Sequence, residues 1–350
     1  MLEYRNCCHA MKAILAALLL AGGAGLTEHA QAQVITLRVA DSLPPSHFIT
    51  RNGTNYFMEE VTKATNGTVR FEHYPSEQLG KAKDMLTALQ SGVADIALVV
   101  PSYMSEKLPL SGVVDLPGGI RSSCQGTFAY AALLEDGGWL AENEFKPNKV
   151  RAVFTFVNPP YELFLSKKGR PNLLDLEGRK VRSVGGALDL TVRDMKGVPV
   201  RLSAPEIREA LSRGTVDGVI WTLPSITAYK LDSLVKSATR GAKLSSIATT
   251  YMISDAAWAK LPETARKAMV RIGQEATRRT CDMTDKDIDT IYAQFEKQGI
   301  DVFDVTSAEQ QALTPVFEKV RQDWVTQLTQ RGKPGKEALA AFEKALAATK

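Results

Sequence analysis

The sequence contains the segment Met85-Leu-Thr-Ala-Leu-Gln-Ser-Gly-Val-Ala-Asp-Ile-Ala-Leu-Val99 and, further along, the similar segment Ile207-Arg-Glu-Ala-Leu-Ser-Arg-Gly-Thr-Val-Asp-Gly-Val-Ile-Trp221. Both contain Ala-Leu-x-x-Gly-x-x-Asp followed by an apolar run. In each, the pattern predicts a helix that ends at the glycine, which readily takes the left-handed conformation of a helix C-terminus. The aspartate then stands just before a buried strand. A generic helix–glycine–strand unit would look alike, so the surrounding pattern decides whether this is a true repeat.

The surroundings of both segments alternate between strands and helices, which is typical of an α/β fold with a largely parallel sheet. Because the alternation recurs around the second segment, we expect two similar α/β lobes in one chain. Around the first segment we predict strands at Val34–Asp41, Thr68–Tyr74 and Ile96–Val100 and a helix at Lys81–Gln90; around the second, strands at Lys180–Val184 and Val198–Leu202 and helices at Ala187–Lys196 and Ala204–Ser212.

Connections between the lobes are predicted around Asn158-Pro159-Pro160 and in the strand-like run Leu244–Met252. A long helix follows Pro262, and two amphipathic helices, Ala308–Gln330 and Lys336–Ala348, end the chain. Several crossovers make a hinge on which two lobes close over a ligand. We therefore predict a two-lobed clamshell, with residues 33–158 plus about 247–286 in lobe I and residues 159–246 plus about 287–350 in lobe II.

The N-terminal segment is predicted to be a signal peptide spanning residues 1–32, with Met11 as the true start. The apolar run Ala13–Leu26 is shorter than the roughly 20 residues that span a bilayer. It leads to Ala30-Gln31-Ala32, a small-residue cleavage site before Gln33. A membrane anchor is the alternative interpretation. With cleavage near Ala32-Gln33, we expect a soluble, monomeric protein in the periplasm.

The composition and motifs favour a solute-binding protein over a nucleic-acid-binding protein or an enzyme. The chain of 350 residues carries a formal net charge of +4 without a basic run, which argues against nucleic acid as a partner. The motifs of serine hydrolases, phosphate-binding loops and zinc peptidases do not occur in it. After cleavage the chain keeps two cysteines, Cys124 and Cys281, and two histidines, His47 and His73. The two cysteines either form one disulfide or are buried and inert. We predict no catalytic residue, no metal site and no cofactor.

Several motifs together resemble the solute-binding subunits of tripartite ATP-independent periplasmic (TRAP) transporters, of the C4-dicarboxylate-binding type. The resemblance covers essentially the whole chain after residue 32. It implies two α/β lobes, hinge strands, a long helix crossing both lobes and a partner complex of two integral membrane subunits. The motifs are Tyr74-Pro-Ser-Glu-Gln-Leu-Gly80, the two repeat segments, Leu176-Glu-Gly-Arg-Lys-Val-Arg182 and Trp258-Ala-Lys-Leu-Pro262.

The resemblance implies that Arg182, at the end of the Lys-x-Arg strand, binds the ligand. A guanidinium presents a planar fork that pairs with both oxygens of a carboxylate. The alternative is a surface arginine at a strand end. Trp221 stands where polar members of the family offer an amide, and it either stacks on a planar ligand or packs in the core. Glu162 lies near the position of a second arginine in some members, and it either contacts an amine or hydroxyl of the ligand or pairs with a local lysine.

Further candidate ligand contacts follow predicted strands, where open α/β sheets bind ligands. They are Ser102 and Tyr103 after one strand and His47 and Phe48 after another, with a surface position as the alternative for His47. We predict a solute-binding subunit that captures a small organic acid: a monocarboxylate with an apolar or aromatic body first, a C4 dicarboxylate second. A ligand-binding partner of a sensor kinase and a periplasmic enzyme are the alternatives.

Overall fold

The computed structural model describes residues 34–349. The predicted signal peptide, its start at Met11 and its cleavage site lie outside these residues. Within 34–349, none of the helices has the length and apolar character needed to cross a membrane.

The first mixed sheet forms lobe I, and its strands run in the order β2-β1-β3-β10-β4. β1 pairs in parallel with β2 and β3, whereas β10 runs antiparallel to β3 and β4. Every residue of β3 is buried, because helices cover the sheet and leave a continuous apolar strand in the middle. The strands are β1 (Ile35–Ala40), β2 (Val69–Tyr74), β3 (Ile96–Val99), β4 (Val150–Val157) and β10 (Ala248–Ser254).

The second mixed sheet forms lobe II, in the order β11-β9-β5-β8-β6-β7. Here β6 is parallel to β7 and β8, and β5 is antiparallel to β8 and β9. The strands are β5 (Glu162–Leu165), β6 (Lys180–Ser183), β7 (Val198–Arg201), β8 (Gly218–Trp221), β9 (Ser237–Arg240) and β11 (Asp301–Asp304).

The expectation of a largely parallel sheet is therefore wrong in one respect. In both sheets the antiparallel neighbours are strands that the chain reaches by crossing between lobes, β10 in the first sheet and β5 in the second. Such strands enter the sheet directly from the other lobe, so no intervening helix forces them into parallel alignment.

The repeat predicted from sequence has the same hydrogen bonds in both lobes. The backbone N–H of Asp95 donates to the carbonyl of Arg38, and the Asp95 carboxylate accepts the Arg38 N–H at 2.9 Å. In lobe II the N–H of Asp217 donates to the Lys180 carbonyl, and the Asp217 carboxylate accepts the Lys180 N–H at 2.8 Å. In each lobe the backbone and the side chain of the aspartate thus bond the same residue of the neighbouring parallel strand. This explains why an aspartate stands just before β3 and just before β8.

Two crossover segments lie side by side between the lobes. The Tyr161 N–H donates to the Ser245 carbonyl at 2.7 Å, and the Leu244 N–H donates to the Tyr161 carbonyl at 2.9 Å. The Asn158 N–H donates to the carbonyl of Ile247 at 3.0 Å. These bonds join the predicted crossover at Asn158-Pro159-Pro160 to the returning strand. The lobe boundaries given above stay a prediction.

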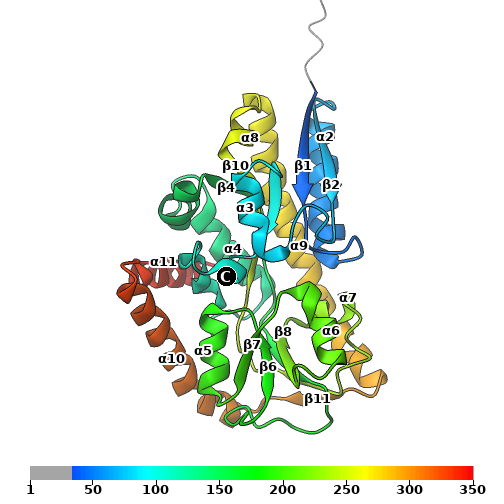
Figure 1. Ribbon diagram of the computed structural model, residues 1–350, viewed down its shortest axis with the longest axis vertical. Coiled ribbons are helices and arrows are strands. Elements are labelled where there is room, and N and C mark those ends of the chain that lie inside the picture. The colour runs from blue at the N-terminus through cyan, green and yellow to red at the C-terminus, as the bar shows by residue number, and fades with distance from the viewer. Residues whose placement is uncertain (1–33, 350) are drawn as a thin grey trace, which may run out of the picture. The chain divides into compact units, whose positions relative to one another are not determined.

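The long predicted helix is α9 (Glu263–Lys297), and it contacts elements of both sheets (Figure 1). It packs on β4 and α2 in lobe I and contacts α7 and β11 in lobe II. The other helices are α2 (Asn55–Ala64), α3 (Met85–Gln90), α4 (Ser123–Leu134), α5 (Gly186–Asp194), α6 (Ile207–Ser212), α7 (Leu223–Ala228), α8 (Asp255–Ala259), α10 (Ser307–Gln330) and α11 (Gly335–Ala348).

A disulfide between Cys124 and Cys281 joins α4 to α9, with 4.8 Å between the Cα atoms. The sequence left this pairing open. Asp285 of α9 also accepts the backbone N–H groups of Ser123 and Cys124 at 2.8 and 2.9 Å. A carboxylate at this position satisfies free N–H groups and complements the positive end of the α4 dipole. The two helices are therefore joined covalently and electrostatically.

Candidate functional site

Arg182 is a cation enclosed completely by protein. Its side chain stands on β6 and is 0% exposed. Nε donates to the carbonyl of Leu202 at 3.0 Å and Nη1 to that of Ile220 at 3.4 Å. Nη2 has no hydrogen-bond partner in the part of the chain that the structure describes. The guanidinium carbon lies 5.4 Å from the ring centre of Trp221. Within residues 34–349, no carboxylate forms an ion pair with Arg182, so its charge meets carbonyl oxygens, an aromatic face and the nearby Tyr103 phenol.

A cavity of about 30 Å³ lies beside this arginine, and both lobes contribute to its wall. Its lining is mostly apolar and aromatic, with a few hydroxyl and amide groups. No lysine or arginine lines it among the described residues. The lining residues are Ser42, Leu43, His47, Ile49, Val100, Tyr103, Asn158, Tyr161, Val184, Ala204, Trp221, Ser225, Tyr229, Ile247 and Thr249.

Three of the residues singled out in the sequence meet in this cavity: His47, Tyr103 and Trp221. Arg182 does not line the cavity as it stands, but it packs against Trp221, which does. The arginine and its tryptophan come from neighbouring strands of lobe II, because β6 and β8 pair in parallel with Arg182 opposite Val219.

Tyr103 carries a polar contact from one lobe to the other. It follows β3 on a short helical turn, η3 (Pro101–Met104), and its hydroxyl accepts the backbone N–H of Ala204 at 2.9 Å. Burial raises the pKa of Tyr103, and the nearby Arg182 charge opposes that shift. The phenol oxygen of lobe I therefore sits where lobe II presents an N–H donor and a guanidinium, an arrangement suited to an anion.

His47 is buried and neutral. Burial lowers the pKa of its imidazole to about 3, and the charge of Arg51 adds to the effect. Nδ1 accepts the backbone N–H of Ile49 at 3.2 Å, which assigns the proton to Nε2. The ring packs edge-on against Tyr229 at 5.7 Å between centres. His47 thus offers the cavity a neutral donor and no positive charge, and the alternative of a surface position for it is wrong.

Ser102 and Phe48 lie close to the cavity without lining it. Phe48 stacks on His47 with 4.5 Å between ring centres and packs edge-on against Phe156. It therefore supports the wall from behind. Ser102 precedes Tyr103 on the same turn but borders two neighbouring cavities on the other side.

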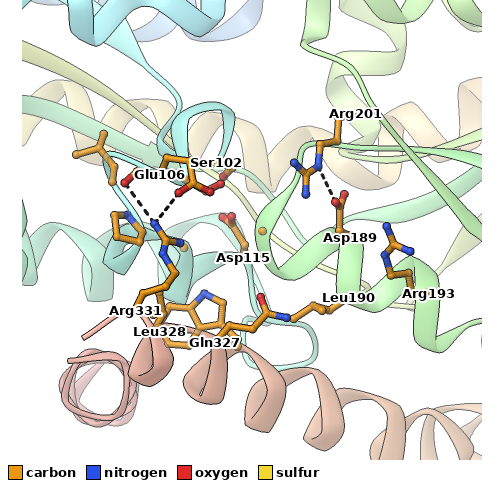
Figure 2. A pocket seen from close by; sticks show the side chains of 16 residues that line it. Ser102, Glu106, Asp115, Asp189, Leu190, Arg193, Arg201, Gln327, Leu328 and Arg331 are labelled. Atoms are coloured by element: carbon orange, nitrogen blue, oxygen red, sulfur yellow. Dashed lines mark hydrogen bonds and ion pairs between the residues drawn. The ribbon is translucent and has the colours of Figure 1, made fainter. Parts of the chain in front are cut away.

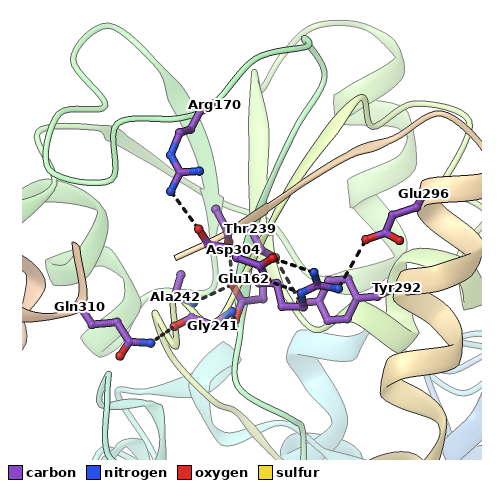
Figure 3. Close-up of polar contacts among 10 residues, drawn as sticks. Glu162, Arg170, Thr239, Gly241, Ala242, Tyr292, Glu296, Asp304 and Gln310 are labelled. Carbon is purple, nitrogen blue, oxygen red and sulfur yellow. Dashed lines mark hydrogen bonds and ion pairs between the residues drawn. The ribbon is translucent and has the colours of Figure 1, made fainter. Parts of the chain in front are cut away.

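Glu162 does not reach the cavity, and the structure gives it a different role. Its carboxylate accepts the Thr239 hydroxyl at 2.6 Å and the backbone N–H groups of Gly241 and Ala242 at 3.0 and 2.9 Å (Figure 3). No lysine side chain forms an ion pair with it within residues 34–349. Burial raises the pKa of Glu162, and these hydrogen bonds oppose the shift. Glu162 holds the chain between β9 and the second crossover against β5, so neither sequence-based interpretation of it holds.

Several cavity residues were not identified from sequence. Tyr161 follows the crossover at Asn158-Pro159-Pro160, so its position at the hinge was available as a signal. Tyr229 follows α7 directly, and its buried hydroxyl has no hydrogen-bond partner among the described residues. No feature of the sequence around Tyr229 marks it, because only the packing of α7 brings it opposite His47.

Two α/β lobes joined by paired crossovers, with a buried cation at the cavity between them, define a solute-binding protein of the clamshell class. The family model described as bacterial extracellular solute-binding protein, family 7, matches residues 39–327. The chain belongs to this family. The predicted identification as a TRAP-type solute-binding protein and the predicted two-lobed fold are thereby confirmed.

Individual relatives agree with this assignment. A solute-binding protein of Albidiferax ferrireducens is 24% identical over 254 residues, which is 71% of this chain and 73% of the relative. A TRAP periplasmic solute-binding protein of Bordetella bronchiseptica, solved with (R)- and (S)-mandelate, has a TM-score of 0.79 at 24% identity, covering 90% of this chain and 100% of that one. A TRAP periplasmic solute-binding protein of Rhodoferax ferrireducens, solved with malonate, has a TM-score of 0.79 at 22% identity, covering 89% and 98%.

Proposed function

We propose that this protein captures a small monocarboxylic acid with an apolar or aromatic body in the periplasm and delivers it to the membrane subunits of a TRAP transporter. The observation that carries the proposal is Arg182, which is buried and, within residues 34–349, has no hydrogen-bond partner for Nη2 and no anionic partner. Burying an unpaired charge costs several kcal/mol. A bound carboxylate removes this cost by forming charge-assisted hydrogen bonds with the guanidinium.

The carboxylate enters when the lobes separate. A cavity of about 30 Å³ holds only two or three water molecules, at roughly 10–15 Å³ each. Tyr103 belongs to the segment after β3, whereas Ala204 and Arg182 belong to lobe II. Opening at the crossovers withdraws the Tyr103 hydroxyl from the Ala204 N–H, so that this N–H becomes available to a ligand beside Nη2 of Arg182. The ligand carboxylate then replaces the tyrosine oxygen.

The cavity lining favours one carboxylate over two. A second carboxylate would be enclosed among tyrosine, tryptophan and aliphatic side chains without a cation beside it, and burying it would be costly. Aromatic walls instead suit a flat or branched apolar body. The neutral imidazole of His47 can donate one hydrogen bond to a hydroxyl of the ligand. Mandelate, bound by the Bordetella bronchiseptica relative, has this combination of groups. Malonate, bound by the Rhodoferax ferrireducens relative, represents the second choice.

Export and delivery to a transporter rest on the family and on the sequence. The family is described as extracellular, and the Ala30-Gln31-Ala32 site suits removal of a leader. We propose that the mature chain begins near Gln33 and acts as a monomer, with binding and release of the acid as its whole activity.

A thermal-shift screen of the purified protein tests the proposal. The panel pairs each acid with its uncharged amide: benzoate with benzamide, mandelate with mandelamide, and malonate and succinate with their diamides. A ligand at 100 times its Kd adds about 2.7 kcal/mol of stability, a rise in Tm of roughly 5 °C. We expect monocarboxylates to raise Tm and their amides to leave it unchanged. Equal shifts by acid and amide, or shifts by dicarboxylates alone, would contradict the proposal.

A further inference from the structure

A second and larger cavity, of about 200 Å³, lies on the other side of Ser102 from the site just described. Its wall combines the segment after β3, one face of α5 and the last turns of α10 (Figure 2). Its mouth is formed by exposed side chains, among them Glu106, Arg193 and Gln327. Solvent and small molecules therefore have access to it, whereas the Arg182 site is enclosed.

Asp115 lies in this cavity as an isolated carboxyl group. It is 1% exposed, and neither of its oxygens has a well-aligned hydrogen-bond donor within residues 34–349. The buried Ser102 hydroxyl, on the same wall, makes no well-aligned hydrogen bond within residues 34–349 either, although it lies near enough to Asp115 to favour the ionised carboxyl. Figure 2 shows the Asp115 carboxyl pointing into the space between Ser102 and the Asp189–Arg201 pair. Native proteins rarely leave a buried carboxyl unsatisfied, so this one suits a ligand that donates hydrogen bonds.

The other charges of the cavity are paired, with one exception. Arg201 bonds Asp189 at 2.6 Å, and Arg331 bonds Glu106 at 2.9 Å. Arg193, at the mouth, forms no ion pair within residues 34–349. The cavity therefore holds one uncompensated acid at depth and one uncompensated base at its entrance.

We propose that this cavity is a second binding site, for a small zwitterion whose ammonium group reaches Asp115 and whose carboxylate meets Arg193. An ammonium group donates three hydrogen bonds, enough to satisfy both Asp115 oxygens and the Ser102 hydroxyl. A simple amine lacks the anionic end that Arg193 attracts. A simple acid brings no ammonium group to Asp115, and it meets a like charge wherever Asp115 is ionised. An ω-amino acid satisfies both ends at once.

The proposal makes binding depend on pH. Burial raises the pKa of Asp115 to about 8, with the Ser102 hydroxyl opposing the shift. The empty site is therefore protonated near pH 7, and an ammonium ligand must displace that proton. Affinity should rise with pH from 6 to 8 and level off above it, with release of a proton on binding. The charged and titratable groups that face Asp115 are Glu106, Asp189, Arg193, Arg201, Arg331, Tyr130 and Tyr161.

Calorimetric titration of the full protein with glycine, β-alanine, 4-aminobutyrate, 5-aminovalerate and butylamine tests the site. We expect one chain length to bind best, and Asp115→Asn to weaken it at least tenfold at pH 8. Arg193→Gln should weaken the amino acid but not butylamine. Asp136→Asn removes an exposed carboxylate elsewhere and should leave every Kd unchanged. Circular dichroism and Tm of each variant confirm that it is folded.

Independence from the first site is checked with Arg182→Met. This variant should leave amino acid binding intact, so failure of one site is distinguishable from failure of the other. Absence of binding at millimolar concentration, an affinity that does not change between pH 6 and 8, or equal loss in Arg182→Met would overturn the proposal.

Discussion

The two lobes use the same strand pair for different purposes. In lobe I, β1 and β3 are locked by Asp95 onto Arg38; in lobe II, β6 and β8 are locked by Asp217 onto Lys180. The pairing registers make these positions equivalent.

Two residues further along the first strand of each pair, lobe I carries Ala40 and lobe II carries Arg182. At the end of the second strand, lobe I carries Val99 and lobe II carries Trp221. The scaffold is therefore repeated, while the proposed anion chemistry is confined to one copy. Lobe II carries the Arg182 guanidinium and the Trp221 ring beside it, and lobe I contributes Tyr103 and His47 to the wall of the cavity.

The largest expected difference between the lobes comes from the disulfide, which joins two helices that both pack on the lobe I strand β4. Removing a native disulfide costs roughly 2–5 kcal/mol, because the unfolded chain regains freedom. Cys281→Ala should lower the free energy of unfolding by about that amount in a urea titration. A reducing agent should lower the free energy of unfolding of the wild type to that of the variant, and it should leave the variant's value unchanged. An unchanged wild-type midpoint under reduction would show that the bond contributes nothing.

Glu162 tests whether lobe II has a structural carboxylate as well as a binding cation. Glu162→Gln places an amide N–H₂ among four donors, because the Lys243 N–H also points at the carboxylate at 3.4 Å. We therefore expect a loss of about 3 kcal/mol in unfolding free energy. The Kd of the monocarboxylate, measured well below Tm, should stay within about twofold. A large change in affinity with little change in stability would show that Glu162 takes part in ligand binding.

The repeat aspartates should differ in importance. Asp95 accepts the backbone N–H and two guanidinium N–H groups of Arg38, whereas Asp217 accepts one backbone N–H from Lys180. We expect Asp95→Asn to cost about 2 kcal/mol and Asp217→Asn about 1 kcal/mol, since hydrogen bonds to charged groups are the stronger ones. Chemical denaturation of both variants makes the comparison. A larger loss in Asp217→Asn would contradict the hydrogen-bond pattern described here.

A further effect is a pH dependence located in the segments that flank α4. Burial raises the pKa of Glu144 to about 7 and that of Asp115 to about 8. A carboxyl whose pKa is raised by folding contributes stability at low pH, and this contribution is lost as pH rises through the folded value. Tm should therefore fall between pH 5 and pH 8, and Glu144→Gln should flatten that fall. A Tm that rises over this range would contradict the assigned shifts.

The sequence predicted the elements and the repeat well, because helices such as α9 and strands such as β3 carry strong local patterns. It also indicated Arg182, Tyr103, His47 and Trp221. It could not predict where Glu162 points. The side chain on a short buried strand is directed by pairing with β8 and β9, whose partners lie far along the chain.

Asp115 and Tyr229 were missed for the same physical reason. Each has an ordinary local sequence and becomes unusual only when distant segments enclose it, α5 and α10 around Asp115 and the His47 segment against Tyr229. The pairing of Cys124 with Cys281 likewise depends on how α4 packs on α9. Local sequence patterns predict helices and strands, whereas the burial of a side chain by segments distant in sequence has to be observed in the structure.

The most direct test of the central claim is a calorimetric titration of Arg182→Met with the monocarboxylate that gives the largest thermal shift. Lys180→Met, an exposed change on the same strand, is the matched control. We predict that Arg182→Met loses at least about 30-fold in affinity, since breaking a buried charge pair costs 2 kcal/mol or more. Its Tm without ligand should change by no more than about 4 °C, because two lost hydrogen bonds are offset by relief of an unpaired buried charge. Binding within threefold of the wild type would contradict the account.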